Sequence, residues 1–157
     1  MASNDTHTAT PVRSNGPVLF AYDGSELARL AIEQAGYQLA PGRDALVVCV
    51  WQPGDVGFLP SGGRHLNAAE ATEVRKAAEE TAADGASLAG KAGFQAQSIA
   101  IEASPTWKGI VAIADERQAS VIVLGSHRRK GLAGHLLGSV AAAVASHSKS
   151  SVLITHS

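Results

Sequence analysis

The chain has 157 residues, of which 45% are hydrophobic and 17% charged; this suits one domain with a buried core and is too short for two ordinary domains. Thirteen Lys and Arg residues nearly balance 14 Asp and Glu residues, and the net charge of −1 gives no basic footprint for nucleic acid. No apolar run is long enough to cross a bilayer, and the single cysteine, Cys49, cannot form an intramolecular disulfide. We therefore expect a cytoplasmic protein that binds neither membrane nor nucleic acid.

The first residues differ in composition from the rest of the chain. Residues 1–16 are rich in Ser, Asn, Asp and Thr and lack the apolar segment of a secretory signal. We predict a disordered N-terminal tail over residues 1–16 and a folded domain over residues 17–157.

Five short apolar runs, too short for helices, predict β-strands. They are Val18–Tyr22, Ala45–Trp51, Ala96–Ile101, Val121–Leu124 and Val152–Thr155. The second and fourth runs are almost continuously apolar, which is typical of strands covered on both faces of a parallel sheet. The third is diluted by Gln95, Gln97 and Ser98, and this indicates an edge strand.

Helical patterns lie between these runs. Leu27, Ala31, Ala35 and Leu39 repeat every four residues, with Ser25 as the expected N-cap and Pro41-Gly42 as the stop. Three further helices are predicted: from near His65 to Gly90 or Gly93, from just after Pro105, and from about Gly138.

Strands and helices thus alternate along the whole domain. This order predicts an α/β fold with a mostly parallel sheet, right-handed crossovers and helices on both faces. Ligands of such sheets bind beyond the carboxyl ends of the strands, where the strand order reverses. The loops at those ends are Asp23–Ser25, Trp51–Gly63, Ala103–Thr106 and Gly125–Gly138.

The segment Gly125–Ser139 carries the strongest chemical signal. It is a glycine-rich loop with the basic run Arg128-Arg129-Lys130, and it leads from a buried strand to the fourth helix. Glycine lets a backbone approach a ligand closely, and a helix N-terminus offers free N–H groups and the positive end of its dipole to phosphate. The segment is therefore a candidate phosphate loop.

The spacing in this segment resembles the nucleotide loop of universal stress proteins, Gly-x2-Gly-x9-Gly-Ser/Thr. Gly125 opens the pattern, nine residues form the spacer 129–137, and Gly138-Ser139 close it. The likeness extends to nearly the whole chain from about Pro17. It includes Asp23-Gly24-Ser25 after the first strand, Val50 in the second, Ala103-Ser104-Pro105 where the family has Gly-x-Pro, and the closing Ser151–Ile154.

This resemblance implies a three-layer α/β/α sandwich whose five-stranded parallel sheet has the order 3-2-1-4-5, a Rossmann-like adenine nucleotide alpha hydrolase-like fold. It implies binding of ATP or a related adenine nucleotide, with Mg²⁺ held mostly by phosphates and water. It also implies a role in the stress response and a homodimer formed through the C-terminal strand 151–155. The residues expected to contact the nucleotide are Ala21, Tyr22, Asp23, Val50, Leu124, Gly125, Ser126, His127, Arg128, Gly138, Ser139 and Val140.

Three of these residues leave alternatives open. His127 either touches a phosphate or is only an exposed loop residue. Arg128 replaces the second glycine of the pattern, so its side chain either obstructs the phosphates or adds a charge-assisted contact to them. Asp23 either hydrogen-bonds the adenine or ribose, or it forms an Asx turn or helix cap.

Efficient enzymatic chemistry is not expected. The sequence has no Walker-type Gly-Lys-Ser/Thr, no paired carboxylates at strand ends, and only His127 as an acid or base near the loop. The six histidines are scattered without the spacing of a zinc site. The alternatives to a nucleotide-binding regulator are a slow ATPase and a stress protein dimer that acts through protein contacts without nucleotide.

Overall fold

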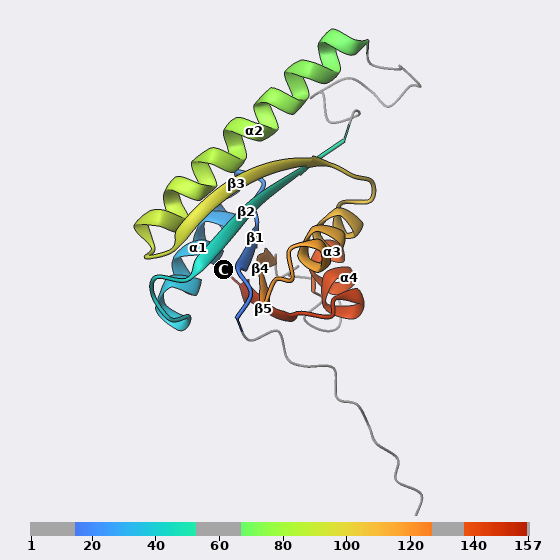
Figure 1. The fold of residues 1–157 in the computed structure, drawn as a ribbon. Helices are drawn as coiled ribbons and strands as arrows, with labels where there is room; N and C mark the ends of the chain where they lie inside the picture. The colour runs from blue at the N-terminus through green and yellow to red at the C-terminus, as the bar shows by residue number, and fades with distance from the viewer. Residues whose placement is uncertain (1–14, 53–66, 127–136, 157) are drawn as a thin grey trace, which may run out of the picture.

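The computed structural model describes residues 15–52, 67–126 and 137–156, in which strands and helices alternate (Figure 1). The strands are β1 (Val18–Ala21), β2 (Asp44–Trp51), β3 (Gln95–Glu102), β4 (Val121–Ser126) and β5 (Ser151–His156). The helices are α1 (Glu26–Gln38), α2 (Ala68–Lys91), α3 (Thr106–Glu116) and α4 (Ser139–His147). Residues 1–14 of the predicted tail lie outside these ranges, and the tail stays a prediction.

The sheet is parallel throughout and has the order β3-β2-β1-β4-β5, which confirms the predicted fold and the edge position of β3. The short β1 lies at the centre, and Phe20 is in register with Val47 of β2 and Val123 of β4. From β1 the chain crosses to β2 and β3 on one side, and then returns to β4 and β5 on the other. The strand order therefore reverses between β1 and β4.

Two helices cover each face of the sheet (Figure 1). On the face of α1 and α2, Phe20 lies edge-on to Phe94, with ring centroids 5.2 Å apart, and both side chains are buried. On the face of α3 and α4, Leu19, Val48 and Ile122 pack with Ile110 and Val144. Neighbouring residues of β1 and β2 thus point into opposite cores, which explains the continuous apolar runs.

The ends of α2 follow local capping rules. The helix begins at Ala68, slightly later than predicted, because Asn67 and Glu70 form a capping box. It ends in a Schellman motif: Gly93 has φ 102° and its N–H donates to the Gly90 carbonyl, while the Phe94 N–H donates to Ala89. No helix in the described ranges is long and apolar enough to cross a membrane.

Candidate functional site

A cavity of about 200 Å³ lies at the carboxyl ends of β1, β2 and β4, where the strand order reverses. This is the position at which open parallel sheets bind ligands. The residues that line it are Ala21, Tyr22, Asp23, Ser25, Leu27, Ala28, Val48, Val50, Thr106, Ile110, Leu124, Gly125 and Val140. Most of the lining is apolar, and the residues with side-chain oxygens are Tyr22, Asp23, Ser25 and Thr106.

The turn Asp23-Gly24-Ser25 leads from β1 into α1. One carboxylate oxygen of Asp23 accepts a hydrogen bond from the Ser25 N–H at 2.9 Å, which forms an Asx turn, and Gly24 has φ 80°. Ser25 is the N-cap of α1, as predicted, because its hydroxyl accepts from the Ala28 N–H at 3.2 Å. Asp23 therefore shapes the turn, while its exposed carboxylate stands at the rim of the cavity.

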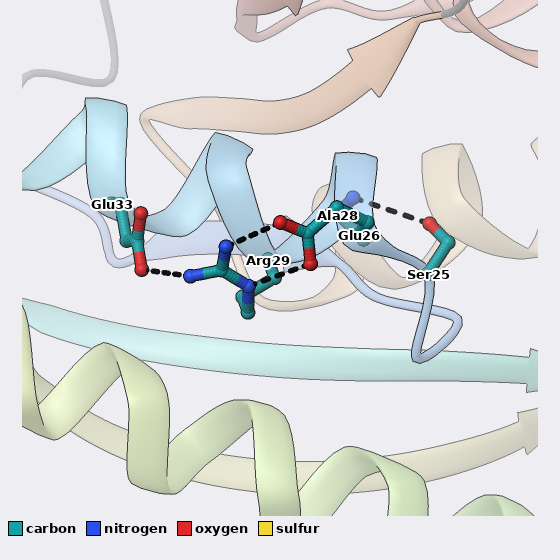
Figure 2. Close-up of polar contacts among 5 residues, drawn as sticks. All are labelled: Ser25, Glu26, Ala28, Arg29 and Glu33. Atoms are coloured by element: carbon teal, nitrogen blue, oxygen red, sulfur yellow. Dashed lines mark hydrogen bonds and ion pairs between the residues drawn. The ribbon is translucent and has the colours of Figure 1, made fainter. Parts of the chain in front are cut away.

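The first turns of α1 carry an ion-pair network (Figure 2). The Arg29 Nε donates to Glu26 at 2.8 Å, one terminal nitrogen donates to the other Glu26 oxygen, and the second donates to Glu33. The hydrogen bond from Arg29 lowers the pKa of the Glu26 carboxyl, and the pKa of Arg29 is raised by the same contact. The acidic group also lies in the first helical turn, where the helix dipole favours negative charge.

Tyr22 belongs to the opposite face of the sheet from most of the cavity. Its ring packs in the core under α1 and α2, close to Gly85 of α2. Burial raises the pKa of the Tyr22 phenol, and the negative charges of Asp84 and Asp23 raise it further. Tyr22 is therefore an uncharged residue that anchors the end of β1, and its N–H donates to the Val48 carbonyl at 2.9 Å.

Gly125 of β4 lies directly against the first turn of α1. A Cβ atom on Gly125 would be 2.7 Å from the Leu27 carbonyl oxygen and 2.9 Å from the Leu27 carbonyl carbon. Real Cβ atoms do not approach backbone atoms so closely, so this position excludes a side chain. Packing against α1 thus requires glycine at the position that opens the predicted phosphate loop, whether or not a ligand binds.

The two ends of the segment between β4 and α4 are joined by a hydrogen bond. The Ser126 side chain, only 3% exposed, accepts from the Gly138 N–H at 2.9 Å. Gly138 is the N-cap of α4, so Ser126 fixes where this helix begins. The next N–H groups, of Ser139, Val140 and Ala141, precede the first intrahelical bond, from Ala142 to Gly138.

The turn after β3 brings the start of α3 to the same edge. The Ala103 N–H donates to the Trp51 carbonyl at 3.1 Å, and the bond between Ser104 and Pro105 is cis. Pro105 is the N-cap of α3 and makes no side-chain capping bond. The hydroxyl of Thr106, the first helical residue, accepts instead from the Gln52 side-chain amide at 3.3 Å.

Three helix N-termini therefore meet at the cavity, those of α1, α3 and α4. Of these, α1 is capped by Ser25, whereas neither α3 nor α4 has a side-chain cap. Within the described ranges, the uncapped N-termini of α3 and α4 and the dipoles of all three helices contribute positive potential at this edge, beside the negative carboxylate of Asp23. An apolar cavity with such a rim suits a ligand that has a flat ring and an anionic group.

The cavity contains seven of the twelve predicted contact residues: Ala21, Tyr22, Asp23, Val50, Leu124, Gly125 and Val140. Ser126, at the end of β4, and Gly138 and Ser139, at the start of α4, adjoin the lining residues Gly125 and Val140. His127 and Arg128 lie outside the described residues, as does most of the Trp51–Gly63 loop.

Sequence reasoning did not assign six other cavity residues to the site: Ser25, Leu27, Ala28, Val48, Thr106 and Ile110. Ser25 and Thr106 lie in two of the loops singled out at the carboxyl ends of strands, which was the available signal. The others are apolar residues whose sequence context resembles that of any core position.

Comparison with known proteins identifies the family of this chain over nearly its whole length. The sequence profile of the universal stress protein family matches residues 15–156. A universal stress protein from Archaeoglobus fulgidus is 25% identical with a TM-score of 0.63, the alignment covering 88% of this chain and 97% of that one. A universal stress protein solved in complex with cAMP is 26% identical with a TM-score of 0.64, covering 90% and 97%.

A third structure, the universal stress protein from Archaeoglobus fulgidus in complex with dAMP, is 24% identical with a TM-score of 0.55 and shares the fold over 88% of this chain and 96% of its own. The profile match, the strand order and the position of the cavity agree with one another. The chain belongs to the universal stress protein family.

Proposed function

We propose that this protein binds an adenine nucleotide, with ATP as the first candidate, and acts in the cytoplasm as a regulatory stress protein rather than an efficient enzyme. The observation that carries the proposal is the apolar cavity at the strand reversal, faced by the N-termini of α1, α3 and α4. Support also comes from the relative at 26% identity, which was solved with cAMP.

In this proposal the two ends of the cavity hold different parts of the ligand. The apolar side chains of Val48, Val50 and Ile110 would enclose the base. The N–H groups of Ser139 and Val140 at the start of α4 would receive a phosphate, as helix N-termini do. Mg²⁺ bound to a triphosphate would be held mostly by phosphates and water.

The test is whether purified protein contains or binds an adenine nucleotide. Denaturing the protein and separating the supernatant by anion exchange should release AMP, ADP or ATP, or added Mg-ATP should raise the unfolding temperature, because ligand that binds only the folded state stabilises it. An Ala21→Leu variant, which places a larger side chain in the cavity, should lose this effect. Ala83→Leu, at an exposed position of α2, is the matched control and should retain it.

Absence of both released nucleotide and any thermal shift in the wild-type protein would contradict the proposal. That result would favour a stress protein dimer acting through protein contacts. Release of ADP from added ATP over time would instead favour the slow ATPase.

We further propose that two copies pair through β5. This strand is the edge of the sheet beside β4, and its residues Val152, Leu153 and Ile154 are only half-buried. Pairing with a second copy along residues 151–155 would give hydrogen-bond partners to the backbone N–H and C=O groups of this edge. An open edge is otherwise prone to aggregation. Light scattering coupled to size exclusion should give about twice the chain mass of 16.1 kDa, and a mass of one chain at all concentrations would contradict the dimer.

A further inference from the structure

A pair of polar side chains lies where the ends of β2 and α3 meet at the cavity. Gln52 directly follows β2, and its amide Nε2 donates a hydrogen bond to the Thr106 Oγ1 at 3.3 Å. The two residues are 54 positions apart in the sequence, so the contact depends on the fold. Both side chains are half-buried, and Thr106 lines the cavity.

The hydroxyl of Thr106 is poised to donate. A threonine hydroxyl has one hydrogen to donate and two lone pairs that accept. One lone pair receives the Gln52 amide, and among residues 15–52, 67–126 and 137–156 the hydroxyl donates to no other group, so its hydrogen is available to a ligand. Its own helix does not use this side chain as a cap, because the N-cap of α3 is Pro105.

Thr106 lies at the end of the cavity that would hold the base of a nucleotide. Val50 lies on the same side of the cavity, with a methyl group close under Gly109 of α3. The uncapped start of α4 lies across β1, on the far side of the strand reversal. A nucleotide whose phosphate is at α4 therefore has its base at the end lined by Val50 and Thr106.

We infer that Thr106, oriented by Gln52, is a specificity-determining residue that donates a hydrogen bond to a ring nitrogen of the bound base. This inference rests on the proposed adenine-nucleotide function. A hydroxyl whose lone pair is already occupied by an amide N–H selects a base edge that presents an acceptor, and adenine offers such nitrogens at positions 1, 3 and 7. The bond from Gln52 restricts the rotation of the hydroxyl and so narrows the directions in which it can donate.

The experiment measures binding of AMP and its 1-deaza, 3-deaza and 7-deaza analogues by calorimetry. Each analogue replaces one ring nitrogen by C–H and so removes one acceptor. The wild-type protein should bind one of the three about 3–10-fold more weakly than AMP, the size expected for one neutral hydrogen bond. Thr106→Val, which keeps the β-branched shape, should bind AMP about 3–10-fold more weakly and no longer distinguish that analogue.

Two further variants test whether the hydroxyl and its orientation, and not the shape of the side chain, cause the discrimination between AMP and the analogue. Thr106→Ser keeps the hydroxyl and should keep the discrimination, while Gln52→Leu should reduce it because the hydroxyl is no longer oriented. Thermal unfolding of each variant, which should stay close to wild type, shows whether the fold is retained.

The inference is overturned if Thr106→Val binds AMP like the wild type, or if it still discriminates against the same analogue. If the wild-type protein binds neither AMP nor Mg-ATP, the proposed function fails and the inference fails with it. The wild-type titrations with AMP and Mg-ATP therefore distinguish the two failures.

Discussion

Replacement of Gly125 by alanine is expected to lower the free energy of unfolding by about 1–3 kcal/mol, the usual cost of forcing atoms into a packed interior. The new Cβ would lie 2.7 Å from the Leu27 carbonyl oxygen and 3.1 Å from the Leu27 Cβ. The closest contacts are backbone atoms, so no change of rotamer relieves them. The first turn of α1 must move away from β4, and nucleotide affinity should fall as well, because Leu27 and Ala28 line the cavity.

Urea denaturation measures this loss, and Gly90→Ala provides a matched control. Gly90 lies near the end of α2, and a Cβ built there meets nothing within 4 Å. The control should be stabilised by about 0.5–1 kcal/mol, because alanine is favoured over glycine in a helix. If Gly125→Ala unfolded like the wild type while nucleotide binding was lost, the glycine would serve the ligand and not the packing.

Gly125 also shows where sequence reasoning reaches its limit. The residue was assigned to the site because it opens a family-like glycine pattern, and it does line the cavity. The contact with the Leu27 backbone joins residues 98 positions apart, so the sequence around Gly125 does not indicate it. A glycine required by a ligand and a glycine required by helix packing look identical until the helix is placed.

The fold was more accessible to prediction because its signals are local. Apolar runs mark buried parallel strands, and Ser25 and Gly93 mark helix ends through rules that involve only adjacent turns. The strand order came from the family resemblance, since alternation alone does not determine it. The predicted start of α2 near His65 is too early, because the capping box of Asn67 and Glu70 begins the helix at Ala68.

Ser126 and Thr106 illustrate the part of the site that could not be predicted. The Ser126 hydroxyl accepts from the Gly138 N–H, and the Thr106 hydroxyl accepts from the side-chain amide of Gln52. The first contact joins the two ends of the segment between β4 and α4, and the second joins the ends of β2 and α3, which meet because parallel strands end at one edge of the sheet. Sequence spacing identifies those loops, but it does not identify which side chains in them become partners.

The turn at Ala103 departs from the family pattern, which has glycine there, and the structure suggests how the extra methyl group is accommodated. A Cβ on Gly109 would lie 2.6 Å from the Ala103 Cβ and 3.3 Å from both the Ile101 Cδ1 and the Val50 Cγ1. The space next to α3 thus holds one methyl group, and in this chain Ala103 supplies it. The Ala103 and Gly109 positions are therefore coupled through a shared volume.

Gly109→Ala is accordingly expected to lower the free energy of unfolding by about 1–3 kcal/mol, because two methyl groups then compete for one space. Adding Ala103→Gly should restore most of this loss, since the methyl group is moved from the turn to the helix. The backbone contributions of the two substitutions nearly cancel. Alanine at position 109 stabilises the helix by about 0.5–1 kcal/mol relative to glycine, and glycine at position 103 destabilises the turn by roughly the same amount. The coupling energy is obtained from a double-mutant cycle in urea. A double variant as unstable as the sum of its two single variants would show that α3 moves freely over the turn, and that the end of the cavity near Val50 and Thr106 is not rigidly positioned.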